Sequence, residues 1–104
     1  MNPWVILLIA GVCETIWALG LKYANGFTAF WPSVITLVIA VASFVLLGTA
    51  MKSLPVGTAY AVWTGIGTLG TAILAVFLFG EPVTLMRVGG IFLIVAGIAA
   101  LKLA

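Results

Sequence analysis

Long runs of apolar residues fill most of this chain, and short segments with polar and charged residues separate them. A helix that spans a bilayer needs roughly 20 apolar residues, because each residue adds about 1.5 Å across a core about 30 Å thick. Four runs come close to that length and predict helices at about 4–21, 32–51, 56–79 and 85–103. The pattern therefore predicts an all-α integral membrane protein with four transmembrane helices.

The segments between these runs carry turn-forming residues. Asn25-Gly26 follows the first run, Lys52–Pro55 separates the second from the third, and Gly80–Pro82 precedes the fourth. No segment is long enough for a soluble domain, so we expect a single transmembrane domain over residues 1–104. The first run has no basic start and no small-residue cleavage site, and Glu14 interrupts it. We therefore expect it to remain in the mature protein and not to act as a signal peptide.

Composition agrees with a membrane protein and excludes several other classes. Apolar residues make up 65% of the chain and charged residues 6%, and a soluble domain of this size could not cover so much apolar surface. Histidine is absent and Cys13 is the only cysteine, so we expect neither a metal site nor a disulfide within one chain. The net charge of +2 is spread over the loops, and nucleic-acid binding, which needs a clustered basic patch, is not expected.

The positive charges are balanced across the predicted membrane. With four spans, Lys52 and Lys102 lie on one side, and Lys22 and Arg87 lie on the other. Orientation follows the excess of Lys and Arg in short cytoplasmic loops, and two against two gives no excess. The charge pattern therefore predicts dual topology, in which copies of the chain insert in both orientations.

An even number of spans limits how one chain could alternate between the two sides of a membrane. Many transporters use two inverted repeats within one chain, and inversion requires an odd number of helices in each repeat. Four helices also bury too little surface to enclose a solvated site. Both limits favour an antiparallel homodimer of two oppositely inserted copies.

One of the two acidic residues lies inside a predicted span. Glu14 falls about ten residues into the first run, roughly 15 Å deep and close to the bilayer midplane. A charge at that depth costs about 3 kcal/mol on insertion scales and marks a functional site. No Lys, Arg or His lies at that depth to pair with it, so we interpret Glu14 as a site for a cation and a proton. Glu81 lies in a loop near Arg87, where we expect it to be solvated or ion-paired.

Several residues are candidates to line a site around this carboxylate. Positions three or four residues apart share a helix face, which places Gly11 and Trp17 beside Glu14. Trp17 and Trp63 lie well inside their spans, where an indole N–H needs a partner. We expect six residues to form or line the site: Glu14, Gly11, Trp17, Ser43, Tyr60 and Trp63.

Glycines in the later runs predict close contacts between helices. Gly65 and Gly67 indicate a bend or a close approach in the third run, and Gly90 and Gly97, seven residues apart, indicate a packing seam in the fourth. No nucleophile–base pair, phosphate loop or metal-ligand cluster is present in the sequence, so we do not expect an enzyme.

Two motifs are similar to those of the small multidrug resistance transporters. GVCETIWALGLKYANGF at residues 11–27 resembles their first-helix signature, and LPVGTAYAVWTGIG at residues 54–67 resembles their third-helix motif. The resemblance extends to length and helix number. Trp17, Lys22-Tyr23 and the run from Trp63 to Gly67 resemble the guanidinium exporter subtype, whereas quaternary-ammonium exporters typically carry glycine at the position of Trp17.

The resemblance implies an antiparallel homodimer in a bacterial plasma membrane that exports guanidinium ion and small guanidinyl compounds in exchange for protons, without a cofactor. It implies that Glu14 binds both proton and substrate, and that Trp17, Ser43, Tyr60 and Trp63 orient the carboxylates or line the site. Thr15 stands where many relatives have valine, and we expect little consequence from it.

Three alternatives to guanidinium export remain. The nearest is a broad-specificity exporter of quaternary ammonium compounds and other drugs from the same family. Another is a small membrane subunit that transports nothing. The third is a rotary-ATPase proteolipid, which is disfavoured because that class is a two-helix hairpin with its acid on the second helix.

Overall fold

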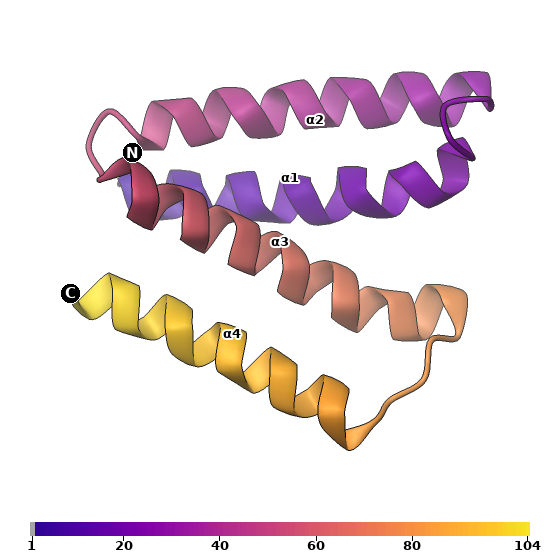
Figure 1. Cartoon of the computed structure of the whole chain (residues 1–104). Coiled ribbons are helices and arrows are strands. Elements are labelled where there is room, and N and C mark those ends of the chain that lie inside the picture. Colours follow the sequence, from indigo (N-terminus) through magenta and orange to yellow (C-terminus); the bar gives the residue numbers. More distant parts are fainter. Residues whose placement is uncertain (1) are drawn as a thin grey trace.

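The computed structural model describes residues 2–104, which form four helices joined by short loops (Figure 1). The helices are α1 (Pro3–Ala24), α2 (Phe30–Ala50), α3 (Val56–Phe79) and α4 (Leu85–Leu103). Each of them is long and apolar enough to cross a membrane. The prediction of an all-α protein with four membrane-spanning helices is confirmed, and α1 continues three residues beyond the expected end.

Local sequence explains where these helices begin and end. The Asn2 side chain accepts a hydrogen bond of 2.8 Å from the Trp4 N–H and caps α1, with proline in the first turn. Asn25 and Gly26 adopt left-handed conformations with φ of 50° and 68° and end that helix. Gly80, with φ of 66°, ends α3 in the same way. The turn residues in the sequence therefore act as helix stops.

Both termini and the α2–α3 loop lie at one end of the molecule, and the other two loops lie at the opposite end (Figure 1). Lys102 approaches the Trp4 ring to 5.6 Å, which joins the last turn of α4 to the first turn of α1. Lys52 and Lys102 therefore share one end, while Lys22 and Arg87 share the other. This is the two-against-two distribution from which dual topology is predicted.

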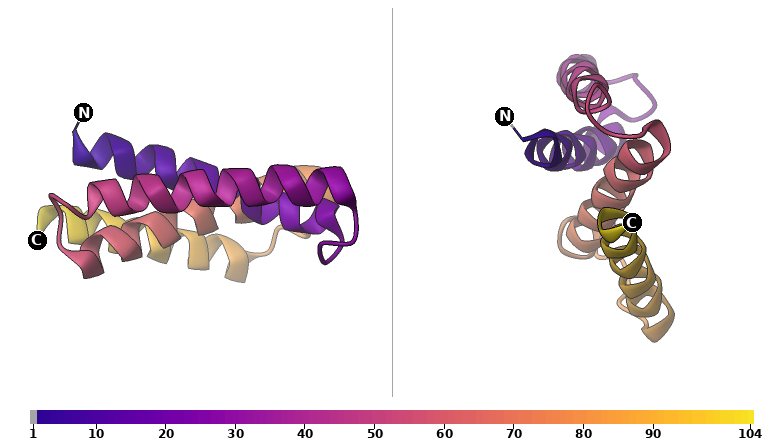
Figure 2. Two further views of the ribbon diagram at one scale, coloured as in Figure 1. Left: turned by 90° about the horizontal axis from the view of Figure 1, so that it is seen from above. Right: turned by 90° about the vertical axis from the view of Figure 1, so that its left-hand side faces the viewer.

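α1 lies between α2 and α3 and packs against both of them, whereas α4 packs along α3 and reaches α1 through the contact of Lys102 with Trp4. Seen along the helices, α4 lies on the side of α3 that faces away from α2 (Figure 2). The molecule measures 40 × 34 × 18 Å, so its thinnest dimension is less than two helix diameters. The buried core consists of Leu7, Ala10, Leu47, Ala50, Ala59, Val62 and Trp63.

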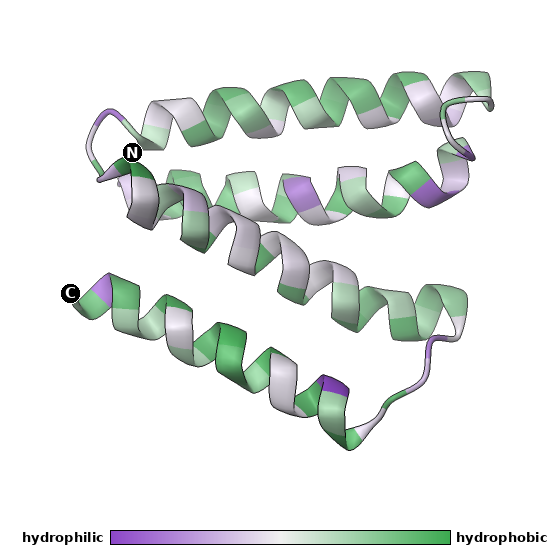
Figure 3. Ribbon diagram, viewed as in Figure 1, coloured by the Kyte–Doolittle hydropathy of each residue, from purple (hydrophilic) through white to green (hydrophobic). Residues whose placement is uncertain are grey.

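Most of the apolar surface of this chain is uncovered. No residue of α4 is buried, and Leu85 and Met86 at its start are 90% and 86% exposed. Apolar residues run along all four helices, and hydrophilic residues gather mainly at the ends (Figure 3). This surface has to meet lipid or another protein chain, because exposure to water on this scale is unfavourable.

Small residues allow the helices to approach closely at several positions. A Cβ atom at Gly11 would overlap the Ile66 side chain of α3, and Gly20 and Gly70 similarly accommodate the side chains of Thr36 and Thr15. Helices in membranes commonly associate through such small residues, because apolar side chains gain little by exchanging lipid for protein.

We expect Gly11→Val to destabilise the fold by about 1–3 kcal/mol, because the added side chain forces Ile66 out of its place. The matched control is Gly48→Val, where a Cβ atom meets nothing within 4 Å. Unfolding by denaturing detergent, followed by tryptophan fluorescence, measures the difference. Equal loss of stability in both variants would contradict the close α1–α3 contact.

Candidate functional site

Glu14 lies near the middle of α1, and its carboxyl group rests against Gly67 of α3. A Cβ atom at position 67 would overlap the carboxyl carbon and Oε2 of Glu14. Gly67 is itself buried, so any larger residue would push the carboxylate away from α3. The sequence pattern assigns Gly67 to helix bending and packing, whereas the structure places it directly beside the carboxylate.

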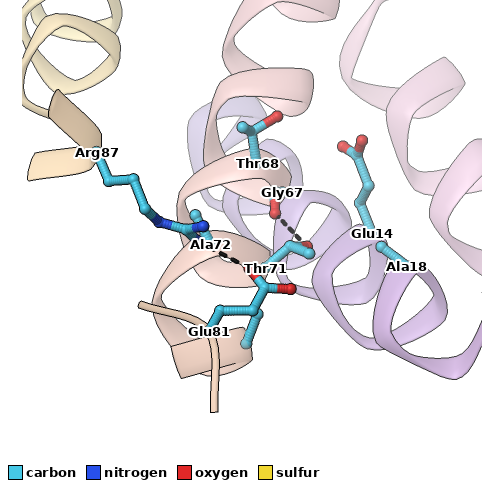
Figure 4. A pocket seen from close by; sticks show the side chains of 9 residues that line it. Glu14, Ala18, Gly67, Thr68, Thr71, Ala72, Glu81 and Arg87 are labelled. Carbon is cyan, nitrogen blue, oxygen red and sulfur yellow. Dashed lines mark hydrogen bonds and ion pairs between the residues drawn. The ribbon is translucent and has the colours of Figure 1, made fainter. Parts of the chain in front are cut away.

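A cavity of about 360 Å³ opens beside Glu14. Its wall comes from α1, α3, the α3–α4 loop and the start of α4, and the residues that line it are Glu14, Ala18, Gly67, Thr68, Thr71, Ala72, Ala75, Glu81 and Arg87. Figure 4 shows the carboxylate extending from α1 toward α3, with Arg87 on the α4 side. The small side chains of α3 provide the space, which a single chain leaves open on one face.

Two polar atoms in this region lack partners. Oε2 of Glu14 and Nε1 of Trp17 are buried and form no hydrogen bond to any residue that the structure describes. Burying such a group unpaired costs about 1–3 kcal/mol, and native proteins usually satisfy it with protein, water or an ion. One turn of α1 therefore presents an acceptor and a donor that a ligand, a proton or a second chain would satisfy.

Ser43 joins three helices through its hydroxyl group. It accepts a hydrogen bond of 3.0 Å from Trp63 Nε1 and donates one of 2.8 Å to the Ala10 carbonyl. Ser43 is fully buried, and it links α3 to α1 through α2. This connection fixes the Trp63 ring and the segment of α1 that precedes Glu14.

Four aromatic rings form a continuous row beside the Ser43 connection. Trp17 and Phe44 have ring centroids 6.1 Å apart, Phe44 and Trp63 5.7 Å, and Trp63 and Tyr60 5.4 Å. Tyr60 is exposed, so the row runs from the helix that carries Glu14 to the surface of α3. Phe44 is absent from the sequence-based site, although an aromatic residue next to Ser43 at the middle of a span could have indicated it.

Thr15 connects the helix of Glu14 to the backbone at Gly67. Its hydroxyl lies 3.2 Å from the Gly67 carbonyl and 3.3 Å from the Gly11 carbonyl. Thr71 also donates to Gly67, at 2.7 Å. Valine would keep the shape of Thr15 but lose the bond between helices. The resemblance to the family predicts little consequence from Thr15, whereas its hydrogen bonds connect the helix of Glu14 to α3 beside the carboxylate.

The remaining glycines are placed differently from Gly67. Gly11 faces Ile66 and does not line the cavity, and a Cβ at Gly65 would lie 2.8 Å from the Ile98 side chain of α4. Gly90 and Gly97 meet nothing within 4 Å in the described chain. The packing seam expected at Gly90 and Gly97 therefore has no counterpart within the described chain. It remains a prediction about contacts with lipid or with another copy of the chain.

The charged residues of the α3–α4 region form an ion pair. Arg87 Nη2 lies 2.9 Å from Glu81 Oε1, which confirms the expected pairing of Glu81. Across residues 2–104, no group of three or more His, Cys, Asp or Glu side chains could hold a metal ion. The polar groups of the cavity are thus one membrane-buried carboxylate, threonine hydroxyls and one ion pair.

The fold and the site together define a class of protein: a four-helix membrane protein with one carboxylate in the middle of a span. The family model described as Small Multidrug Resistance protein matches residues 2–94. The chain belongs to the small multidrug resistance family, as its motifs predict, and is a multi-pass protein of the bacterial cell membrane.

Curated relatives carry the name "Guanidinium exporter". The protein of Yersinia pseudotuberculosis is 64% identical over 59 residues, which are 57% of this chain and 57% of the relative. That of Escherichia coli strain K12 is 61% identical over 59 residues, covering 57% of this chain and 56% of the relative. The matched stretch thus spans a little over half of each relative. These relatives are named as exporters and not as enzymes.

We expect Ser43→Ala to destabilise the protein by about 1–3 kcal/mol, because it leaves the buried Trp63 N–H without an acceptor. The control is Thr49→Ala in the same helix, since the exposed Thr49 hydroxyl donates to the Val45 carbonyl of its own helix. Detergent-induced unfolding of both variants tests the connection. A smaller effect for Ser43→Ala than for Thr49→Ala would contradict it.

Proposed function

We propose that this protein exports guanidinium ion and small guanidinyl cations in exchange for protons, as an antiparallel homodimer. The observation that carries the proposal is Glu14, a carboxylate in mid-membrane whose Oε2 is buried and has no partner among the described residues. The names of the relatives support the choice of substrate.

The carboxylate couples proton and cation because it can hold only one of them at a time. A protonated Glu14 is neutral and tolerated in the membrane, whereas an ionised Glu14 needs a cation beside it. Binding of one ligand therefore weakens binding of the other by the same factor. Two copies bring two such carboxylates, so up to two protons exchange for one monovalent cation.

The shape of one chain supports a site shared by two copies. The cavity beside Glu14 is open on one face, the molecule is only 18 Å thick, and α4 has no buried residue. A second copy would close the cavity and cover apolar surface. The balanced positive charges of the loops favour insertion of that copy in the opposite orientation.

Guanidinium matches the unsatisfied groups of the site. The ion is planar, permanently charged, and presents N–H donors within its plane, so it can donate charge-assisted hydrogen bonds to the Glu14 carboxylates. Rings of the aromatic row can border its faces, adding about 1–2 kcal/mol of cation–π attraction in a dry site. Trp17 lies one turn of α1 from Glu14, and its indole N–H, which has no partner among the described residues, can donate to a carboxylate.

A broad drug exporter of the same family would need a wider site. A quaternary ammonium ion has no N–H group, so it would leave carboxylate oxygens unsatisfied at a cost of about 1–3 kcal/mol. The geometry therefore favours the small planar cation.

We expect purified protein in liposomes to transport guanidinium about 5- to 150-fold more efficiently than tetraethylammonium, the ratio that follows from that loss of hydrogen bonds. Trp17→Gly should reduce the ratio by opening the space beside Glu14, and Glu14→Gln should abolish exchange of both ions. Guanidinium affinity should rise with pH and reach a plateau once the carboxylates are ionised.

Equal transport of guanidinium and tetraethylammonium by the unmodified protein would contradict guanidinium export and support the drug-exporter alternative. Affinity that does not change with pH, or normal exchange by Glu14→Gln, would refute proton coupling at this residue. Failure to bind or move any cation would favour a non-transporting subunit.

A further inference from the structure

The cavity that begins at Glu14 has a second charged end. Glu81, in the loop after α3, and Arg87, in the first turn of α4, line the same cavity of about 360 Å³. Their side chains are 44% and 34% exposed, and 2.9 Å separates Oε1 of Glu81 from Nη2 of Arg87. This ion pair therefore stands where the cavity opens toward one end of the helices.

The cavity wall between Glu14 and the ion pair is polar enough to contact a small cation. Thr71 of α3 lies between Glu14 and the ion pair, whereas Thr68 lies level with the Glu14 carboxylate (Figure 4), and the small side chains of Ala72 and Ala75 also line the cavity. The Thr71 hydroxyl donates to the Gly67 carbonyl, so its oxygen still has acceptor capacity. A cation leaving Glu14 along this wall would meet the Thr71 hydroxyl oxygen first and the Glu81 carboxylate next.

The chemistry of the ion pair identifies the ligand. Arg87 ends in a guanidinium group, and Glu81 accepts a hydrogen bond from one of its terminal N–H groups. A free guanidinium ion offers the same planar donors, so it can replace Arg87 without leaving the carboxylate unpaired. Partly exposed ion pairs contribute little to stability, and such an exchange therefore meets little resistance.

We propose that Glu81 is a second binding subsite for guanidinium cations at the mouth of the cavity, and that Arg87 occupies it until cargo displaces the side chain. This proposal rests on guanidinium export as the proposed function. In an antiparallel dimer each membrane face would carry one such subsite, because the α3–α4 loops of the two copies lie on opposite sides. Cargo would pass between Glu14 and Glu81 on its way in or out.

Single variants of the pair should change guanidinium transport in opposite directions. Glu81→Gln leaves Arg87 unpaired at the mouth, so KM should rise; Arg87→Gln frees the Glu81 carboxylate, so KM should fall and release should slow kcat. Each change should be about two- to fivefold, the size expected for partly exposed charges. An ion pair that only held the loop in place would be lost equally in both variants and would shift KM in one direction.

A second measurement separates a subsite from a general effect of charge. In Glu14→Gln protein with ¹⁵N-labelled arginine, guanidinium should shift the Arg87 side-chain resonance, because cargo displaces Arg87 from Glu81. Tetramethylammonium at equal concentration and ionic strength should leave that resonance in place, since it has no N–H donors. Adding Glu81→Gln should remove the response to guanidinium.

The outcomes distinguish the two proposals. Unmodified protein that does not transport guanidinium would overturn both the export function and the subsite. Normal guanidinium transport together with KM shifts of the same sign, or with no shift, would overturn the subsite alone. An Arg87 resonance that responds equally to guanidinium and tetramethylammonium would also overturn it.

Discussion

The rest of this structure depends on one constraint: a carboxylate lies in the middle of a membrane-spanning helix and finds no hydrogen-bond partner among residues 2–104. In hydrocarbon such a group must be neutralised or paired. The described residues leave Oε2 of Glu14 unpaired, and they place a cavity beside it instead of a basic side chain. The hydrogen-bonding capacity of this oxygen has to be satisfied by a ligand or proton that binds and dissociates, or by another copy of the chain.

The packing around Glu14 is divided between a fixed part and an open part. Thr15 ties α1 to α3 at Gly67, and Ser43 ties α1 and α3 to α2 through Ala10 and Trp63. These buried bonds set the carboxylate in a defined position, as a selective site for a small ion requires. Among the described helices α4 packs along α3 only, and the cavity is left without a wall on one side. One chain thus holds the carboxylate in a fixed position but provides only part of the cavity wall, and the rest of the wall has to be supplied.

Hydropathy and turn residues suffice to predict four helices and the depth of Glu14, because both depend only on distance along the chain. The roles of Gly67 and Gly11 could not be predicted, since they depend on how α1 and α3 are rotated against each other. Gly67, expected only at a bend or close approach, lies beside the carboxylate, and Gly11, expected to line the site, lies against Ile66. Ser43 gave a weak signal, because a membrane serine often bonds to its own helix; only three-helix packing directs it to Ala10.

The central claim, that two oppositely oriented copies share the site, is tested most directly by fixing the orientation of each copy. Two lysines added to the α1–α2 loop in one variant, and to the α2–α3 loop in another, would bias insertion in opposite directions. Guanidinium exchange should be lost in either variant alone and restored when both are produced together, while paired glutamine insertions should leave it intact. Exchange at the normal rate by a population shown to have a single orientation would contradict the account.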